Sequence, residues 1–456
     1  MRVLKFGGTS VGTPKSLRNV KKIVEAIDEP AIVVVSALGG ITDRLIATAR
    51  MAASADKSWE ESYAEILRRH REMIDSLVPS EKHETVTKLV GELLDELHDL
   101  CRGLFLIRDL SERTLDLVVS YGERSSSLIV SSVVKGARYF NSLDFIRTEK
   151  WFGKNIASTE FTERLLKETF ADFADGIAIC GGFISRDKDT DDITNLGRGG
   201  SDYTAALIAA TLDADVLEIW TDVDGFMTGD PRVIPSARVI DRMSFIESMQ
   251  LCTFGAKVIY PPTIYPVFHK NIPIKILNTF NPSAPGTLIT DAVDMTCPAK
   301  GISALKDMNL ITVGGITGEE ISAINSRIYS ALSKCGINVI PAISTEKGSS
   351  HKESLIVSMD ASGNAVETLK SEFAPELMAG TIGVIESVPE LSTIAVVGEN
   401  VKSDPGFAPR IYHTLDRARI PLLARAGAGS DTTIAFVVPA RCTIDALNLI
   451  HTSFFC

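Results

Sequence analysis

The stretch best suited to chemistry is a glycine-rich loop, Asn195-Leu-Gly-Arg-Gly-Gly-Ser-Asp-Tyr-Thr204, which leads into an alanine- and leucine-rich segment of high helix propensity. Its polar pair predicts a helix N-cap at Ser201 or Asp202. Glycines let backbone amides approach a ligand, and a helix start carries partial positive charge, so the loop and Arg198 suit a phosphate or a carboxylate. A tight turn in which glycine serves only packing is the alternative.

A lysine stands directly before a second glycine turn near the N-terminus. Residues 2–6 alternate as a strand, Gly7-Gly-Thr-Ser10 follow, and residues 14–27 have the apolar spacing of a helix. A P-loop is excluded because Thr13 occupies the place of the Walker lysine. Lys5, at the strand end, could face an anion held by the turn, or could be an ordinary edge-strand lysine.

Two more strand-turn units repeat this pattern. Residues 31–35 predict a buried strand, followed by the turn Ser36-Ala-Leu-Gly-Gly40 and a helix that opens at Thr42. Residues 173–179 predict another strand, which ends in the turn Cys180-Gly-Gly-Phe-Ile-Ser185. Parallel units place their loops at one edge of a sheet, so we expect the turns to be neighbours.

An acidic residue, Glu123, precedes an apolar helix predicted around residues 127–134. It could cap that helix, or pair with a substrate ammonium if it lies across a site from Arg198. Residues 59–106 predict a charged, solvated helical hairpin that covers or lids the site, with Leu94, Leu97 and Leu100 on one face.

A polar loop with several acids follows the next predicted strand, at residues 216–220. It reads Thr221-Asp-Val-Asp-Gly225 and then Met227-Thr-Gly-Asp-Pro-Arg232, and it has too few ligands for an EF-hand. Aspartates beside an arginine suit the ribose and phosphates of a nucleotide, although a plain turn is equally compatible. A capping box at residues 244–247 starts a helix that ends near residue 255, and Lys257 follows as a third candidate cation.

Size and composition narrow the class of protein. A chain of 456 residues is expected to form two or three domains, and its net charge of -11 argues against general nucleic-acid binding. Seven cysteines without a C-x-x-C pair fit reduced thiols. The N-terminus does not look like a signal peptide, and the longest apolar run is too short for a bilayer. We therefore expect a cytoplasmic protein with neither nucleic-acid nor membrane partners.

The C-terminal third has a different pattern, an internal duplication of a ferredoxin-like βαββαβ module. We expect such a duplicated module to bind a small molecule or to dimerise. The first copy is predicted as strands 310–313, 338–343, 353–358 and 381–385 with helices 319–334 and 365–373, and residues 391–451 repeat most of it.

Together and in this order, five motifs resemble those of the aspartate kinases of the amino-acid kinase superfamily: Lys5-Phe-Gly-Gly-Thr-Ser10, Gly197-Arg-Gly-Gly-Ser-Asp202, Thr221-Asp-Val-Asp-Gly225, Asp230-Pro-Arg232 and Phe254-Gly-Ala-Lys257. The C-terminal duplication resembles their tandem ACT domains, and the match covers essentially the whole chain. The resemblance implies an α/β fold, with an αβα-sandwich kinase domain over residues 1–293 and ferredoxin-like ACT domains over 300–388 and 389–456.

The resemblance also implies an activity. It is ATP-dependent phosphorylation of the L-aspartate side-chain carboxylate to 4-phospho-L-aspartate, the first step toward lysine, threonine and methionine, with Mg²⁺ bound to the nucleotide. ACT domains imply a lysine or threonine effector and a homodimer or homotetramer. Another amino-acid kinase, such as a glutamate kinase, and a non-catalytic ACT amino-acid sensor are the alternatives.

Roles for individual residues come from the same resemblance. Lys5 would contact the transferring phosphoryl group and Asp202 would orient the lysine side of the site. Arg198 would bind the α-carboxylate of aspartate and Glu123 its ammonium. The remaining substrate-binding residues would be Thr42, Gly199, Gly200 and Ser201. The nucleotide would be bound by Gly7, Gly8, Ser10, Thr221, Asp222, Met227, Arg232, Lys257 and Val258.

Two positions depart from the family's pattern. Relatives often carry tyrosine where this chain has Met227, which leaves only apolar packing for a base. Lysine-sensitive members often carry aspartate after the equivalent of Val339, whereas Ile340 follows here, which favours threonine or no tight feedback. The resemblance is nearest to the kinase half of bifunctional kinase–dehydrogenases, so a monofunctional relative or the kinase part of a longer enzyme is expected.

Overall fold

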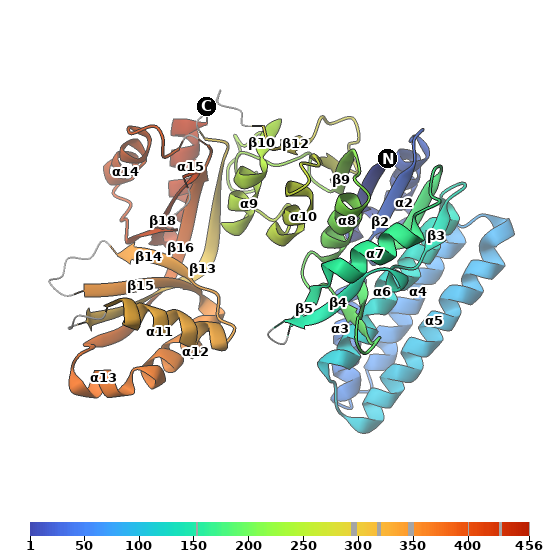
Figure 1. Cartoon of the computed structure of the whole chain (residues 1–456), viewed down its shortest axis with the longest axis horizontal. Helices are drawn as coiled ribbons and strands as arrows, with labels where there is room; N and C mark the ends of the chain where they lie inside the picture. Colours follow the sequence, from blue (N-terminus) through green and yellow to red (C-terminus); the bar gives the residue numbers. More distant parts are fainter. Residues whose placement is uncertain are drawn as a thin grey trace. The chain divides into compact units, whose positions relative to one another are not determined.

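The computed structural model describes residues 1–151, 154–292, 299–316, 321–344, 351–399, 401–427 and 431–455. The chain divides into two compact units (Figure 1). Unit 1 comprises Met1–Phe226 and Ile259–Asp291, and unit 2 comprises Met227–Val258 and Ala292–Cys456. Residues 227–258, which the sequence analysis placed in the kinase domain, thus cluster with the C-terminal part.

Unit 1 is built on a mainly parallel sheet with strand order β12-β11-β9-β1-β2-β6-β3. The central strands β2 and β6 are buried along their whole length, as expected for parallel strands covered on both faces. Only β12 runs antiparallel to its neighbour β11 within this part of the sheet. The strands are β1 (Arg2–Phe6), β2 (Ala31–Val35), β3 (Arg138–Phe140), β6 (Ile177–Gly181), β9 (Val216–Thr221), β11 (Ile274–Asn278) and β12 (Thr287–Thr290).

Helices connect these strands, and a small second sheet has the order β5-β4-β7-β8. Its strands are β4 (Arg147–Trp151), β5 (Lys154–Ala157), β7 (Ile184–Asp187) and β8 (Ile193–Asn195). The helices of unit 1 are α1 (Gly8–Val11), α2 (Pro14–Glu25), α3 (Ile41–Ala53), α4 (Trp59–Leu77), α5 (Ser80–Ile107), α6 (Glu112–Val133), α7 (Thr159–Thr169), α8 (Gly200–Thr211) and α10 (Ile264–Phe268), with short 3-10 turns at Ser142–Asp144 and Pro261–Thr263.

The predicted helical hairpin forms as α4 and α5, but it is not a separate lid. Leu94 and Leu97 are 1% and 0% exposed and belong to the same apolar core as the strands β1 and β2. Leu100 is partly buried against that core. One face of the hairpin therefore completes the core of unit 1, and only the opposite, charged face is solvated.

Unit 2 contains a closed barrel with strand order β13-β15-β14-β17-β18-β16. Its strands are β13 (Gly301–Ile316), β14 (Ile340–Ser344), β15 (His351–Ser358), β16 (Val384–Val397), β17 (Ala424–Ala426) and β18 (Thr433–Pro439). Its helices are α11 (Ile321–Lys334), α12 (Met359–Glu372), α13 (Ala374–Ala379), α14 (Phe407–Arg417) and α15 (Thr443–Phe454), with a 3-10 turn at Ala440–Cys442. Residues 227–258 add β10 (Arg242–Ser244) and α9 (Phe245–Thr253).

The two ferredoxin-like modules share their longest strands. Residues 308–314 of β13 pair with the first half of β16, whereas residues 301–305 pair with residues 393–397 of its second half. Ile302 accordingly packs in the second module's core, although the sequence analysis assigned residues 300–388 to the first. Residues 301–305 thereby add a strand to the second module.

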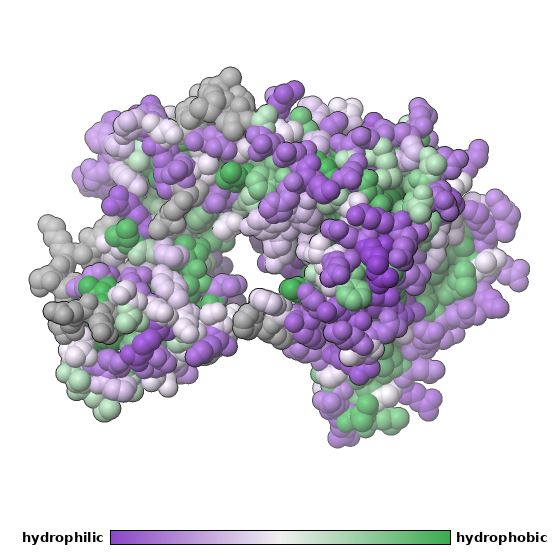
Figure 2. All heavy atoms as spheres, in the orientation of Figure 1, coloured by the Kyte–Doolittle hydropathy of each residue, from purple (hydrophilic) through white to green (hydrophobic). Residues whose placement is uncertain are grey.

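Hydrophilic residues dominate the visible surface (Figure 2). None of the helices in the described ranges is both long and apolar enough to cross a membrane.

Candidate active site

A cavity of about 320 Å³ lies in unit 1 where three glycine turns meet the start of α8. It brings together residues that the sequence analysis selected from turns far apart in the chain. Predicted site residues that line it are Lys5, Gly8, Thr42, Glu123, Arg198, Gly199, Gly200, Ser201 and Asp202. Residues 36–40 and Phe183 complete the wall.

The turns meet because the strands that carry them are neighbours and parallel. β1 pairs with β2, and β2 pairs with β6, so the three turns emerge at one edge of the sheet. Their glycines then pack backbone against backbone. A Cβ at Gly8 would lie 3.1 Å from the Ala37 carbonyl oxygen, and one at Gly182 would lie 2.6 Å from the Ser201 Cα. The predicted proximity of the turns is confirmed.

Lys5 and Asp202 form a shielded ion pair on the cavity wall. The Lys5 Nζ lies 2.6 Å from the Asp202 Oδ1, and the two side chains are only 13% and 12% exposed. Lys5 is the last but one residue of β1, between Val34 of β2 and Ile219 of β9. Because its strand is central, the ammonium is fixed in place rather than free in solvent.

The N-cap of α8 is Gly199, not Ser201 or Asp202 as we predicted. Gly199 has φ +69°, and a Cβ there would lie 2.4 Å from the Cβ of Tyr260. Only glycine fits this left-handed, crowded position. Ser201 and Asp202 therefore fall in the first helical turn, where they line the cavity.

Glu123 lies in the middle of α6 and caps nothing, because the helix starts at Glu112 with Ser111 as N-cap. Its carboxylate is 3% exposed, and Oε1 accepts a hydrogen bond of 3.1 Å from the Ala37 N–H. Oε2 is buried without a partner among the described residues. Burial raises the pKa of Glu123 to about 8. A buried carboxyl with one free oxygen facing a cavity suits a cationic group.

Other predicted nucleotide-binding residues of unit 1 do not line this cavity. Ser10 is fully buried, and its hydroxyl shares a 2.8 Å hydrogen bond with the Thr279 hydroxyl. Gly7 lies beside Lys5, whose Nζ would be 3.4 Å from a Cβ at that glycine. Thr221 ends β9, and its hydroxyl donates to the Asp222 carboxylate at 3.2 Å.

The remaining predicted nucleotide residues belong to unit 2. Arg232 is exposed and pairs with the Asp230 carboxylate at 2.9 Å, and Lys257 is also exposed. Met227 forms an isolated antiparallel bridge with Val239, and Val258 is half-buried. These side chains stand on segments that pack within unit 2.

A larger cavity of about 1120 Å³ shares Gly197 and Arg198 with the first. Residues 195–198 of the glycine-rich loop form part of its wall, and so does Asp116, which no sequence motif marked. The Asp116 carboxylate accepts hydrogen bonds from the side-chain amides of Asn155 and Asn195, and burial raises its pKa. The acids and amides lie on different elements, so no local motif marked them.

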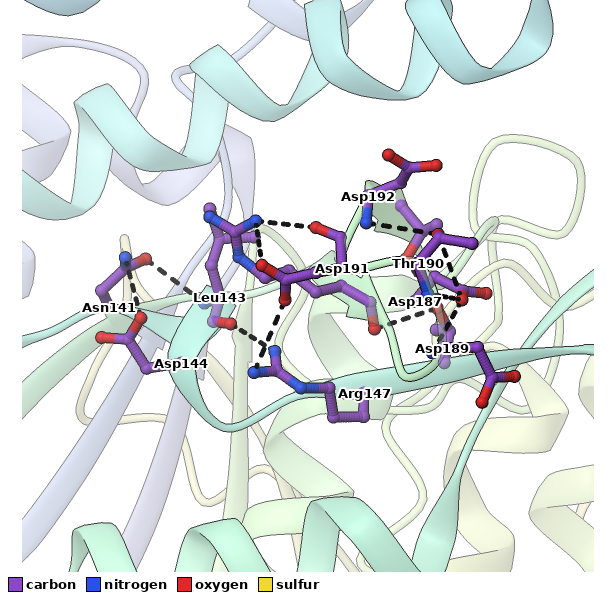
Figure 3. Close-up of polar contacts among 12 residues, drawn as sticks. Asn141, Leu143, Asp144, Arg147, Asp187, Asp189, Thr190, Asp191 and Asp192 are labelled. Atoms are coloured by element: carbon purple, nitrogen blue, oxygen red, sulfur yellow. Dashed lines mark hydrogen bonds and ion pairs between the residues drawn. The ribbon is translucent and has the colours of Figure 1, made fainter.

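The loop between β7 and β8 forms part of that wall (Figure 3). Its Asp187 carboxylate accepts from the N–H groups of Asp189 and Thr190 at 3.0 and 2.9 Å, which closes the turn. Arg186 donates to the Asp191 carboxylate at 3.2 Å. The carboxylates of Asp187 and Asp191 thus shape this loop.

Comparison with known proteins now adds to this geometry. The sequence pattern of the amino acid kinase family matches residues 1–278. The chain belongs to the amino acid kinase family. An ACT domain pattern matches residues 394–454, which fall in the second ferredoxin-like module.

Relatives in this family are aspartokinases, which confirms the resemblance predicted from the motifs. The chain is 34% identical to a bifunctional aspartokinase/homoserine dehydrogenase of Haemophilus influenzae, over 100% of this chain and 56% of that protein. It is 31% identical to a chloroplastic bifunctional enzyme of Arabidopsis thaliana, over 99% of this chain and 50% of that one. The chain therefore spans about half the length of these relatives.

Solved structures of aspartokinases share the fold over the whole chain. The complex of E. coli aspartokinase III with aspartate and ADP, described as the R-state, has a TM-score of 0.84 and 25% identity, with 100% of both chains covered. Its complex with lysine and aspartate, described as the T-state, has a TM-score of 0.75 and 26% identity with the same coverage. The predicted α/β kinase fold with a C-terminal ACT region is confirmed.

Proposed function

We propose that this chain is an aspartate kinase, which transfers the γ-phosphoryl group of ATP to the side-chain carboxylate of L-aspartate. The observation that carries the proposal is that Lys5, Glu123 and Arg198 line one small cavity. An amino-acid substrate presents one ammonium and carboxylates. The cavity offers two cations and two acidic groups for them, of which Asp202 is already paired with Lys5 and Glu123 is not paired with a cation. The E. coli relative in complex with aspartate and ADP supports the same assignment.

The chemistry needs positioning and charge neutralisation rather than a general base. The side-chain carboxylate of aspartate is ionised at pH 7, so it can attack phosphorus directly. Charge on the transferring oxygens must be balanced, and the Lys5 ammonium, which lies 2.6 Å from the Asp202 carboxylate, would do this. Arg198 would bind the α-carboxylate and Glu123 the ammonium of the substrate.

Nucleotide binding would involve Gly7, Gly8 and Ser10 near β1 and Thr221 and Asp222 after β9. In unit 2 the nucleotide contacts would be Met227, Arg232, Lys257 and Val258. Among the described residues, no three His, Cys, Asp or Glu side chains gather as a metal-binding group. We propose that Mg²⁺ is held chiefly by the phosphates of ATP, as is usual for this ion.

The domain boundaries, effector and assembly are also proposals. We propose a kinase domain over residues 1–293 and ACT domains over 300–388 and 389–456. A lysine or threonine effector would bind the ACT region, as lysine binds E. coli aspartokinase III. Ile340 at the start of β14 favours threonine, or no tight feedback, over lysine, and a homodimer or homotetramer is expected.

A coupled assay for ADP formation tests the function. Purified protein should turn over with ATP and L-aspartate, and far more slowly with L-glutamate, whose side chain is one methylene longer. Equal or faster turnover with glutamate would favour the glutamate kinase alternative, and no turnover with either, despite binding of lysine or threonine, would favour a non-catalytic sensor. Repeating the assay with added lysine and with added threonine identifies the effector.

A further inference from the structure

One arginine outside the cavity connects two of its walls. Arg69 is a partly buried residue of α4. Its Nη1 donates to the Gly39 carbonyl at 2.9 Å, and its Nη2 donates to the Gly12 carbonyl at 2.8 Å. Gly12 ends the turn after β1, and Gly39 lies in the turn after β2. A single planar guanidinium thus bridges the two turns.

The helix that carries this arginine is fixed. Ile66 and Met73, three residues before and four residues after Arg69, are 0% and 2% exposed in the core of unit 1. Residues spaced in this way lie on one face of a helix. The guanidinium is therefore presented from a packed surface, not from a mobile side chain at the end of a solvated helix.

The turns that it bridges have little room to separate or to close. A Cβ at Gly12 would lie 2.8 Å from the Gly8 oxygen and 3.0 Å from the Gly39 nitrogen. The backbones already touch, so small shifts of one turn would move the other. Gly8, Gly39 and Gly40 all line the cavity, whereas Arg69 does not.

The hydrogen bond to Gly39 also orients the next amide. The C=O and N–H of a trans peptide unit point in opposite directions, so holding the Gly39 carbonyl on Arg69 turns the Gly40 N–H away from Arg69. Gly40 lines the cavity and is the N-cap of the thirteen-residue helix α3. An amide at such a helix start is a donor for an anion.

We propose that Arg69 is a positioning residue for phosphoryl transfer. It acts through the glycine turns, by fixing the distance between the Lys5–Gly8 wall and the Ala37–Thr42 wall and by directing the Gly40 amide toward the substrate's oxygens. It touches neither substrate nor nucleotide. The kinetic part of this proposal rests on the proposed aspartate kinase activity.

Two substitutions and a matched control test it. Arg69→Ala removes both hydrogen bonds, and Arg69→Lys keeps the charge but, with a single ammonium, cannot bridge both carbonyls as a guanidinium does. Arg68→Ala is the control, because Arg68 is 60% exposed and its ion pairs among the described residues run along its own helix, to Glu65 and Glu72. We expect kcat to fall on the order of a hundredfold in Arg69→Ala, with a smaller change in the aspartate KM, and to stay unchanged in Arg68→Ala.

Rescue separates positioning from general loss of structure. Millimolar guanidinium ion should restore part of the kcat of Arg69→Ala and leave Arg68→Ala unaffected, and Arg69→Lys should be intermediate. If Arg69→Ala does not fold, Arg69→Lys decides: a folded lysine variant with reduced kcat supports the proposal, and one with wild-type kcat overturns it. A folded Arg69→Ala variant with wild-type kcat also overturns it.

Hydrogen–deuterium exchange provides a readout that does not depend on the activity. Amides of residues 12–13 and 39–41 should exchange faster in both Arg69 variants, while those of β6 should not change. Unchanged exchange in both turns would overturn the bridge. If the wild-type enzyme fails to phosphorylate aspartate but the exchange result holds, the proposed function fails and the structural role of Arg69 stands.

Discussion

The two sets of predicted site residues stand on different foundations. Lys5, Glu123, Arg198 and Asp202 line one cavity in unit 1, at the edge of a parallel sheet. Met227, Arg232, Lys257 and Val258 lie in unit 2, on segments packed against the second ferredoxin-like module. We refer to them as the unit 1 set and the unit 2 set.

The unit 1 set is held in place by the packing of the main chain around it. Lys5 projects from a strand end, Arg198 and Asp202 project from the loop and first turn at the start of α8, and Glu123 projects from the middle of α6. The central cation, Lys5, is paired and shielded. Such a site is preorganised, so the loss of one charge should be costly.

The segments that carry the unit 2 set are held by side-chain contacts with the second ferredoxin-like module. The Thr228 hydroxyl shares a 2.8 Å hydrogen bond with the His451 Nε2 of α15, and Ile234 lies in the core of the second module. The capping residue of α9, Ser244, donates to the Glu399 carboxylate at 2.6 Å. The two sets therefore differ in what they pack with: the unit 2 set lies with the second ferredoxin-like module, and the unit 1 set lines a cavity at the strand ends of unit 1.

The largest expected effect is the loss of Lys5. Lys5→Ala should lower kcat by on the order of a hundredfold or more, because it removes a fixed cation at the transferring phosphoryl group. Steady-state assays at saturating ATP and aspartate measure this, and Lys22→Ala, an exposed lysine on α2, is the control. A folded Lys5→Ala enzyme with a rate close to wild type would contradict a role of the unit 1 set in catalysis.

Arg198→Ala should act mainly on aspartate binding. Removing a charged hydrogen-bond donor from the α-carboxylate should raise the aspartate KM by roughly tenfold to a hundredfold, with a smaller effect on the ATP KM. Arg113→Ala is the matched control, since Arg113 lines only the larger cavity and is 75% exposed. An unchanged aspartate KM in Arg198→Ala would show that Arg198 does not bind the substrate's α-carboxylate.

Glu123 should make both the stability of the protein and its binding of aspartate depend on pH. Its pKa is raised from about 4.5 to about 8, so between these values the folded state binds more protons than the unfolded state. Stability contributed at this position is therefore full below pH 4.5 and decreases as the pH rises toward 8, by at most about 1.4 kcal/mol per pH unit. Glu123→Gln should remove that decrease, which chemical denaturation at pH 5 to 8 would measure.

The same substitution should change how substrate binding depends on pH. An ammonium binds the ionised carboxylate, so the wild-type aspartate KM should fall as the pH rises from 6 to 7.5, and the KM of Glu123→Gln should be high and nearly constant. Parallel pH profiles in the two proteins would show that Glu123 does not contact the substrate ammonium.

The smallest expected effect sharpens the comparison from the other side. His451→Phe preserves the ring that stacks on Phe455 but loses the hydrogen bonds to Thr228 and Ser236. It should raise the ATP KM about threefold and leave the aspartate KM unchanged, because the two neutral hydrogen bonds that are lost each contribute little. His413→Phe, at an exposed position on α14, is the control. A change in the aspartate KM alone would contradict the division into two sets.

The sequence by itself determined the strand-turn units, the duplicated C-terminal module and most residues of the unit 1 set. These features are local: apolar runs predict strands, glycines predict turns, and parallel units bring their turns to one edge. Family motifs then indicated the roles of individual residues.

Only the tertiary structure decided which backbones and side chains meet. Gly199 is the N-cap of α8 because its left-handed conformation and the neighbouring Tyr260 exclude a side chain there. Residues 301–305 belong to the second module because they pair with residues 393–397 of β16. Arg69 bonds to Gly39, which is 30 residues away in the sequence, and to Gly12, which is 57 residues away. Contacts of this kind depend on the packing of distant segments, which no local pattern of residues encodes.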